Sequence, residues 1–365
     1  MERTGAAKRI FISDCEGPIT RNNIAAEMMA HFVPSGSRVF EVISKYDEAL
    51  ANLQKDRDYA AGNTHKLVLP FLMAYDVDNQ VMEEFCASHL VLHLGSKTTL
   101  DHVRDISRAF IVSTTYEHYI RAFCKQTGFP LENTYCTKLN LEDIKINNKE
   151  KLKLKSFAWE IAGMPIIKIP SNATSLHDLT KKEHETVKQL DKIFWKEISG
   201  MHCKKIFSDV TIAAGNEKEQ IVREITATFS APMEDVMYVG DSRADAKALR
   251  LVRDGGGFAV SMNGNADAIR SAQVAVLSAN GLAVPVLADI FLRLGKAEAL
   301  NVVGNWDRDA LWRSAAYPPI LDLLFEAYPK TLPKAKIISE WNREQLIKES
   351  NEFRKAQNEL ATQPH

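Results

Sequence analysis

Two carboxylates follow the first apolar segment of this sequence. Residues 10–12 (Ile-Phe-Ile) are too few for a helix and are bounded by polar residues, which is typical of a buried strand in a parallel sheet. Asp14 and Glu16 come next, and then Gly17-Pro18, which continues neither a helix nor a central strand. Open α/β sheets bind ligands at the carboxyl ends of their strands, so this pair is a candidate site. Taken alone, the same residues are more typical of an ordinary turn.

Further polar residues follow later apolar segments or begin a helix. They are Ser113 and Thr114 after residues 109–112, Lys218 in the first turn of a helix expected over 216–228, and Asp241 and Asp245 after residues 236–239. Parallel strands end at one edge of a sheet, so we expect these side chains to converge there.

The chemistry of these residues is complementary. Asp14 and Asp241 offer the hard oxygen ligands that suit Mg²⁺. Ser113 and Lys218 are donors for the oxygens of a phosphoryl group, whose transfer needs positioning, cationic neutralisation and an in-line nucleophile. A carboxylate can be that nucleophile and form an aspartyl-phosphate. A second carboxyl, here Glu16, can protonate the leaving oxygen and then activate water.

Strand and helix patterns alternate over residues 205–290, which predicts an α/β fold with a parallel sheet between layers of helices. Strands are expected at 10–12, 109–112, 133–137, 236–239, 257–260 and 274–277. Residues 21–100 show helical periodicity without a strand signal, which indicates a helical insertion. Residues 140–203 are rich in lysine and helical, and we interpret them as a second insertion.

Composition narrows the class of protein. The formal net charge of −1 gives no field that points to nucleic acid or an anionic membrane. No apolar stretch is long enough to span a bilayer. Because the first expected strand begins within ten residues of Met1, we expect no signal peptide. The five cysteines are scattered and form no CxxC pair, which favours reduced thiols and a cytoplasmic location.

The order of these motifs resembles the haloacid dehalogenase (HAD) superfamily of aspartate-nucleophile phosphatases. The four motifs are Asp14-Cys15-Glu16-Gly17-Pro18-Ile19-Thr20, Phe110-Ile111-Val112-Ser113, Gly215-Asn216-Glu217-Lys218 and Gly240-Asp241-Ser242-Arg243-Ala244-Asp245. Asn263-Gly264-Asn265 also resembles a loop that follows the fourth motif in some members. In finer detail, the sequence is similar to predicted phosphatases catalogued with energy-converting hydrogenase A as its subunit R.

The resemblance implies a three-layer, Rossmann-like HAD core with an inserted helical cap, in the position used by phosphoserine phosphatase-like members. The implied division is a catalytic core at 1–20, 101–139 and 204–300, a cap at 21–100, a second insertion at 140–203 and a helical C-terminal extension at 301–365. We expect the cap to select the substrate. Its candidate residues are Arg38, Lys45, Tyr46 and Asp47, with His118 reaching in from the core.

The resemblance also implies roles for the site residues. Asp14 is the implied nucleophile and a Mg²⁺ ligand, and Asp241 is a further ligand. Glu16 is implied to bind the metal through its backbone carbonyl and to act as acid and base through its side chain. Asp245 is a neighbouring ligand or supports the ligands. The residues implied to bind the phosphoryl group of the substrate are Gly17, Ser113, Thr114 and Lys218.

One departure from the family pattern affects the expected function. Glu16 stands where the family has Asp, and the extra methylene moves the proton donor by about 1.5 Å, enough to cost about 100-fold in rate unless the site is rebuilt around it. The expected function is Mg²⁺-dependent hydrolysis of a small phosphate ester. Two alternatives remain open: a weakly active or non-catalytic binding or assembly subunit, and a phosphotransferase. A protein partner or homo-oligomer is also open.

Overall fold

The computed structural model describes residues 9–54, 62–170 and 173–361, without the side chains of 358–361. Parts of the expected domain ranges, namely residues 1–8, 55–61, 171–172 and 362–365, lie outside the described residues. None of the described helices is both long and apolar enough to cross a membrane.

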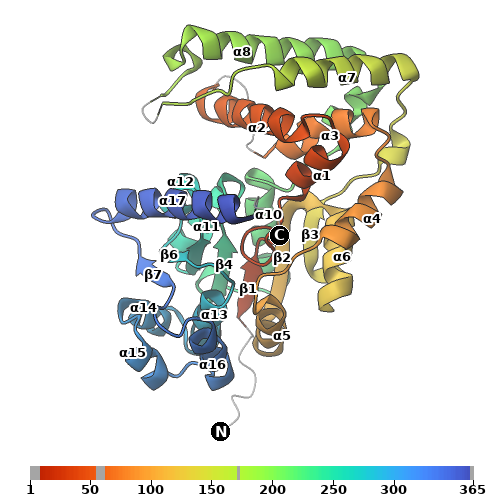
Figure 1. Cartoon of the computed structure of the whole chain (residues 1–365). Helices are drawn as coiled ribbons and strands as arrows, with labels where there is room; N and C mark the ends of the chain where they lie inside the picture. Colours follow the sequence, from red (N-terminus) through yellow and green to blue (C-terminus); the bar gives the residue numbers. More distant parts are fainter. Residues whose placement is uncertain (1–8, 55–61, 171–172, 362–365) are drawn as a thin grey trace.

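A seven-stranded sheet forms the centre of the lower part of the molecule in Figure 1. In order across the sheet, the strands are β3 (Thr134–Thr137), β2 (Arg108–Tyr116), β1 (Ile10–Ser13), β4 (Val236–Gly240), β5 (Phe258–Met262), β6 (Val274–Leu277) and β7 (Lys334–Ile337). All neighbouring pairs are parallel except β6 and β7. The chain adds strands on one side of β1 and later on the other, so the topological switch point lies at β1 and β4.

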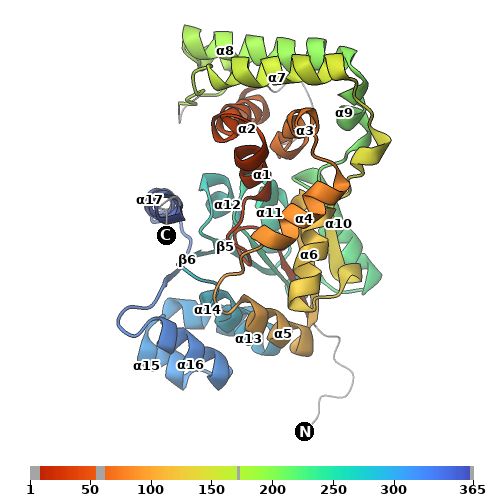
Figure 2. The same cartoon turned by 45° about the vertical axis from the view of Figure 1, so that its right-hand side comes forward.

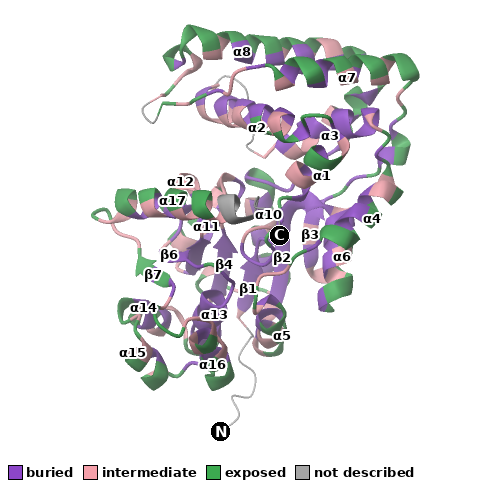
Figure 3. Ribbon diagram, viewed as in Figure 1, coloured by how far each residue is buried: buried purple, intermediate pink, exposed green. Residues whose placement is uncertain are grey.

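Strands β1 to β6 are buried along most of their length because helices cover both faces of the sheet (Figure 3). Ile10 and Ile12 pack into one apolar cluster and Phe11 into another, as the alternation of side chains along a strand requires. The helices on the first face are α10 (Asn216–Thr228), α11 (Ala246–Asp254) and α12 (Ala266–Ser271), and those on the second include α5 (Ser96–Ile106) and α13 (Ala283–Leu294). The expected three-layer α/β fold is confirmed.

The C-terminal extension was expected to be helical, and this expectation was incomplete. It contains the antiparallel edge strand β7 as well as helices. Its helices are α14 (Lys296–Gly304), α15 (Arg308–Arg313), α16 (Pro318–Ala327) and α17 (Arg343–Ala361). Only Ala335 of β7 is buried, so the strand has almost no apolar pattern of its own. Its pairing with β6, where Ala335 lies opposite Val276, defines it.

A helical layer lies above the carboxyl ends of the strands (Figure 1). It combines α1 (Ile24–Phe32), α2 (Gly36–Leu53) and α3 (Thr64–Ala74) with α7 (Asn148–Ala162), α8 (Lys181–Lys192) and α9 (Lys205–Asp209). Two stretches of sequence, expected as separate insertions, therefore pack together. Phe194 of the second stretch stacks on Tyr46 of α2 and meets the edge of Phe71 of α3, with ring centroids 5.7 and 6.1 Å away.

The stretch 21–100 does not all belong to this layer. Helix α4 (Asn79–His89) packs against α6 (Glu117–Thr127), and α5 packs against α13 beside the sheet (Figure 2). The chain thus returns to the sheet before β2 begins.

Candidate active site

Strands β1 and β4 end side by side and bring two of the predicted carboxylates together. Ser13 is in register with Val239, and the Asp14 amide donates a 2.9 Å hydrogen bond to the Val239 carbonyl. One carboxylate oxygen each from Asp14, Asp241 and Asp245 lies within 4.8 Å of the others. The structure therefore gathers three predicted residues at the switch point of the sheet.

Lys218 connects two of these carboxylates from the start of α10. Its Nζ donates to Asp14 Oδ2 at 2.5 Å and to Asp245 Oδ1 at 2.7 Å, and its side chain is fully buried. Burial alone would lower the pKa of this ammonium group, but Asp14 and Asp245 outweigh burial and raise it. Lys218 is therefore a permanent cation inside the site.

Asp245 accepts donors on both of its oxygens. Besides Lys218, its Oδ1 accepts the Tyr238 hydroxyl at 2.9 Å. Its Oδ2 accepts the Asp241 amide at 3.2 Å, and the Ser242 amide and hydroxyl at 3.0 and 2.9 Å. Burial would raise the pKa of Asp245, but Lys218 and these hydrogen bonds lower it. This carboxylate is thus committed to holding Lys218 and the turn that carries Asp241.

For the other two carboxylates, burial outweighs the cations that favour the charged form. Burial raises the pKa of Asp14 to about 6, although Lys218 opposes the shift. Burial also raises the pKa of Asp241 to about 8, against the effect of Arg354. Two buried carboxylates, Asp14 and Asp245, and the partly buried Asp241 thus face one buried lysine. A divalent cation would supply the missing positive charge, and the all-oxygen donor set fits Mg²⁺.

Gly17 allows the loop after β1 to approach Asp241 closely. Its φ is +93°, in the region that favours glycine, and a Cβ built there would lie 2.7 Å from Asp241 Cγ. Its amide closes the turn through a 2.9 Å hydrogen bond to the Thr20 carbonyl. This glycine therefore shapes the wall of the carboxylate cluster.

The Glu16 side chain points away from that cluster and toward the helical layer. Its Oε1 accepts the Ile24 amide at the start of α1 at 2.7 Å, and its Oε2 lies 3.8 Å from His65 Nε2 on α3. Sequence reasoning missed His65, because a histidine in a helical insertion has no local pattern that links it to a strand end. The Glu16 carboxylate therefore lies between the sheet and the helices above it.

Ser113 and Thr114 near the carboxyl end of β2 have different surroundings. Ser113 lies near Asp14, and its hydroxyl lowers the pKa of the Asp14 carboxyl. The Thr114 Oγ1 is buried and has no hydrogen-bond partner among the described residues. The structure thus places Ser113 at the predicted nucleophile and leaves the Thr114 hydroxyl available to a ligand.

The residues proposed for substrate selection have other contacts in the structure. Arg38 and Lys45 form ion pairs with Glu41 and Glu48 of their own helix. The Tyr46 hydroxyl donates a hydrogen bond to Asp191, and Asp47 accepts hydrogen bonds from the amide and hydroxyl of Thr64. The His118 ring forms a hydrogen bond with the Asn79 side chain. The contacts of Tyr46, Asp47 and His118 join different helices, whereas the two ion pairs lie within α2. Their role in substrate selection stays a prediction.

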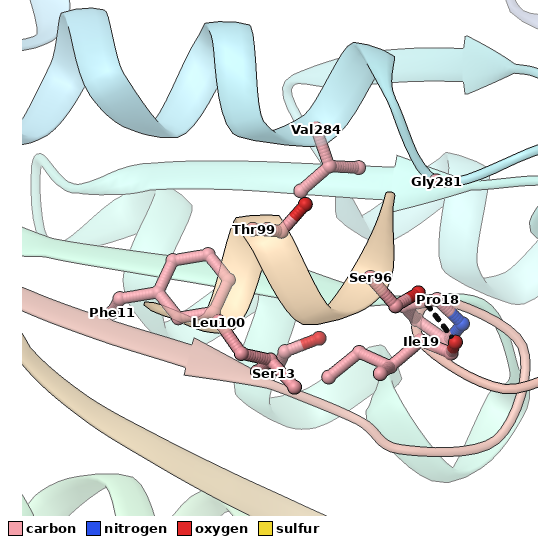
Figure 4. A pocket seen from close by; sticks show the side chains of 9 residues that line it. All are labelled: Phe11, Ser13, Pro18, Ile19, Ser96, Thr99, Leu100, Gly281 and Val284. Carbon is pink, nitrogen blue, oxygen red and sulfur yellow. Dashed lines mark hydrogen bonds between the residues drawn. The ribbon is translucent and has the colours of Figure 1, made fainter. Parts of the chain in front are cut away.

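A small cavity lies beneath the loop after β1, between β1, α5 and the start of α13 (Figure 4). Its volume of about 10 Å³ is that of about one water molecule. The Ser96 hydroxyl donates to the Ile19 carbonyl at 2.7 Å on its border. No carboxylate lines it, so it is a packing gap behind the site.

No family model and no curated protein matches the chain. The structure of gene product AF1437 from Archaeoglobus fulgidus aligns with 97% of this chain and 98% of its own, at 22% identity and TM-score 0.76. A HAD family hydrolase from Salmonella enterica serovar Typhi aligns with 71% of this chain and 64% of its own, at 12% identity and TM-score 0.42. A phosphoserine phosphatase with a phospho-aspartyl intermediate analogue aligns with 73% and 92%, at 10% identity and TM-score 0.42. The first likeness shows a shared fold, and the other two are too distant to argue from.

Proposed function

We propose that this protein is a Mg²⁺-dependent phosphomonoester hydrolase of the HAD type that acts on a small phosphorylated metabolite. The observation that carries the proposal is the Asp14 carboxylate, buried at the switch point of a parallel sheet, 2.5 Å from Lys218 and beside Asp241. As part of this proposal, the chain is placed nearest the predicted phosphatases catalogued with energy-converting hydrogenase A. We also propose a cytoplasmic location, which rests on the five free cysteines.

In the first step, an Asp14 oxygen attacks phosphorus while the bond from phosphorus to the ester oxygen breaks. The Glu16 carboxyl gives its proton to that leaving oxygen, and the alcohol departs. Lys218 and the hydroxyls of Ser113 and Thr114 stabilise the phosphoryl oxygens. Mg²⁺, held by Asp14, Asp241 and the Glu16 carbonyl, would neutralise charge on the transferred group.

In the second step, Glu16 accepts a proton from water as the water oxygen attacks phosphorus. The bond from phosphorus to Asp14 breaks, which releases inorganic phosphate and restores the Asp14 carboxylate. Lys218 stays within reach of that carboxylate in both steps, because Asp245 holds it from the other side.

We also propose that the helices above the strand ends act as the cap. The Glu16 side chain supports this role, since it bonds the first amide of α1 and faces His65 of α3. A movement of these helices would then move the acid and base. The proposed core remains 1–20, 101–139 and 204–300, with 301–365 as an extension of it.

The test is hydrolysis of a generic aryl phosphate by the purified protein, with Mg²⁺ and with a chelator. Asp14→Asn should lower turnover by more than about 10⁴-fold because the nucleophile is lost, without lowering the temperature of unfolding. Asp309→Asn, an exposed carboxylate of α15, is the matched control and should keep full activity. Full residual activity in Asp14→Asn would contradict the nucleophile assignment.

A second candidate is a protein that binds a phosphate ester and turns it over slowly or not at all. The hydrogen bond that ties Glu16 to Ile24 favours it, because a fixed carboxylate cannot follow the leaving oxygen. Mg²⁺ binding without turnover of any phosphate ester would support this candidate. A phosphotransferase is separated from both by product analysis with an acceptor alcohol, which would yield a new ester in place of free phosphate.

A further inference from the structure

Helix α17 reaches the candidate site although it lies far downstream of the four motifs. It runs beside α12 and toward the carboxyl ends of the strands (Figure 1), and the turned view shows it nearly end-on (Figure 2). Ser350 of α17 is fully buried, and its hydroxyl donates to the Gly264 carbonyl at 2.7 Å. This contact fixes the helix against the loop that follows β5.

Arg354, one turn further along α17, joins two loops of the site. Its Nη1 donates to the Asp241 carbonyl at 3.1 Å and to the Asn263 carbonyl at 3.0 Å. The Asp241 carbonyl also accepts the Asn265 amide at 2.8 Å. The loops after β4 and β5 are therefore held together at the residue whose side chain belongs to the carboxylate cluster.

We infer that Arg354 is a positioning residue for Asp241, so that α17 forms part of the cation site. This inference rests on the proposed function, which assigns Asp241 to Mg²⁺. Arg354 does not touch the reacting atoms. It fixes the backbone of Asp241 from outside, and such supporting contacts are worth about 10- to 100-fold in metal affinity.

The positive charge of Arg354 works in the opposite direction. Its Nη1 lies 3.6 Å from Asp241 Oδ2, where it would repel a divalent cation. However, the side chain is 37% exposed, so water screens this repulsion. The two bonds to carbonyls have hydrogen-bond length, whereas the contact with the carboxylate exceeds it. We therefore expect positioning to outweigh repulsion.

The experiment is calorimetric titration of the metal-free full-length protein with Mg²⁺, without substrate. Arg354→Met keeps much of the stem and removes the charge and the donors, and the dissociation constant should rise about 10-fold or more. Arg354→Lys keeps the charge and one donor group, and should recover part of the affinity. Lys348→Met removes one charge from the exposed side of the same helix and should bind Mg²⁺ as the wild type does.

The outcomes separate this inference from the proposed function. An unchanged dissociation constant in both Arg354 variants, or tighter binding in Arg354→Met, would overturn the inference while leaving the hydrolase proposal intact. Weaker binding in Arg354→Met, with no ester turnover by the wild type, would support the inference and remove the hydrolase. A wild-type protein that binds no Mg²⁺ would overturn the inference outright. Should Arg354→Met fail to fold, Arg354→Lys decides by the same titration.

Discussion

The two sides of the candidate site differ in how completely their polar groups are paired. On the core side, Lys218 bonds two carboxylates and Asp245 accepts donors on both oxygens. On the side that faces the helical layer, the buried His65 Nε2 and Thr114 Oγ1 have no hydrogen-bond partner among the described residues.

This difference indicates where a ligand belongs. The bonds of Lys218 to Asp14 and Asp245 hold these side chains before a ligand arrives, so this part of the core side is organised in advance and leaves Asp14 and Asp241 to a cation. An unpaired buried polar group costs about 1–3 kcal/mol, which a bound molecule could recover. We therefore expect substrate to complete the hydrogen bonding on the side of His65 and Thr114, and the core side to supply the chemistry.

The largest effect is expected from breaking the core side. Lys218→Met leaves Asp14 and Asp245 buried without their cation, which should destabilise the protein by about 3–5 kcal/mol and lower turnover by about 1,000-fold. Chemical denaturation and the aryl phosphate assay measure the two effects. Arg223→Met, on the exposed face of the same helix, breaks only a surface ion pair with Glu219 and should cost less than about 1 kcal/mol. Equal losses of stability and turnover in the two variants would contradict the proposed role of Lys218 in the site.

A smaller effect is expected from Glu16, which links the two sides. Glu16→Gln removes the proton but keeps the shape, and should lower turnover by about 100-fold. The loss should be larger for an alkyl phosphate than for an aryl phosphate, because a phenolate leaves without protonation more readily than an alkoxide. Glu16→Asp should keep part of the activity on both esters. Equal losses on the two esters would contradict the role of Glu16 as a general acid.

The smallest effect concerns stability and pH in the absence of metal. The pKa values of Asp14 and Asp241 are raised to about 6 and about 8, above the value of about 3.9 expected in the unfolded chain. Their stabilising contribution is thus fully present below about pH 4 and is lost as pH rises through 6 and then 8. In chelator, the temperature of unfolding should fall between pH 5 and about pH 8.5.

Asp241→Asn isolates the upper part of that pH dependence. Without the carboxylate, the variant should unfold at a higher temperature than the wild type near pH 8.5 in chelator, and the difference should shrink toward pH 5. Mg²⁺ should raise the unfolding temperature of the wild type only. Parallel pH curves for the two proteins would show that Asp241 does not carry the raised pKa.

Local sequence patterns were sufficient to predict those site residues that directly follow a strand. Asp14 and Asp241 come after buried runs that read as strands without any knowledge of the rest of the chain, and the end of a parallel strand is a fixed location. Lys218 follows the same logic, because it begins a helix on one face of the sheet. The α/β fold and the convergence of these residues were therefore predictable.

The contacts made by long-range packing could not be predicted from the sequence. His65 reaches Glu16 only because α3 folds back over the strand ends. Residues 140–203 join the same helical layer only through contacts between distant segments, such as the stacking of Phe194 on Tyr46 and the hydrogen bond from Tyr46 to Asp191. β7 is a strand because β6 pairs with it. Arg354 meets Asp241 across 113 residues of sequence.

The sequence by itself thus determined the central strands, the expected fold class and the carboxylates with their lysine, since each depends on a short segment whose burial pattern is local. Tertiary structure alone decided their surroundings. These are the direction of the Glu16 side chain, the buried His65 and Thr114 atoms without a hydrogen-bond partner among the described residues, and the bond from Arg354 to the Asp241 carbonyl. The physical reason is that a side chain acquires its partners only when separate elements pack, and no local pattern records which elements those are.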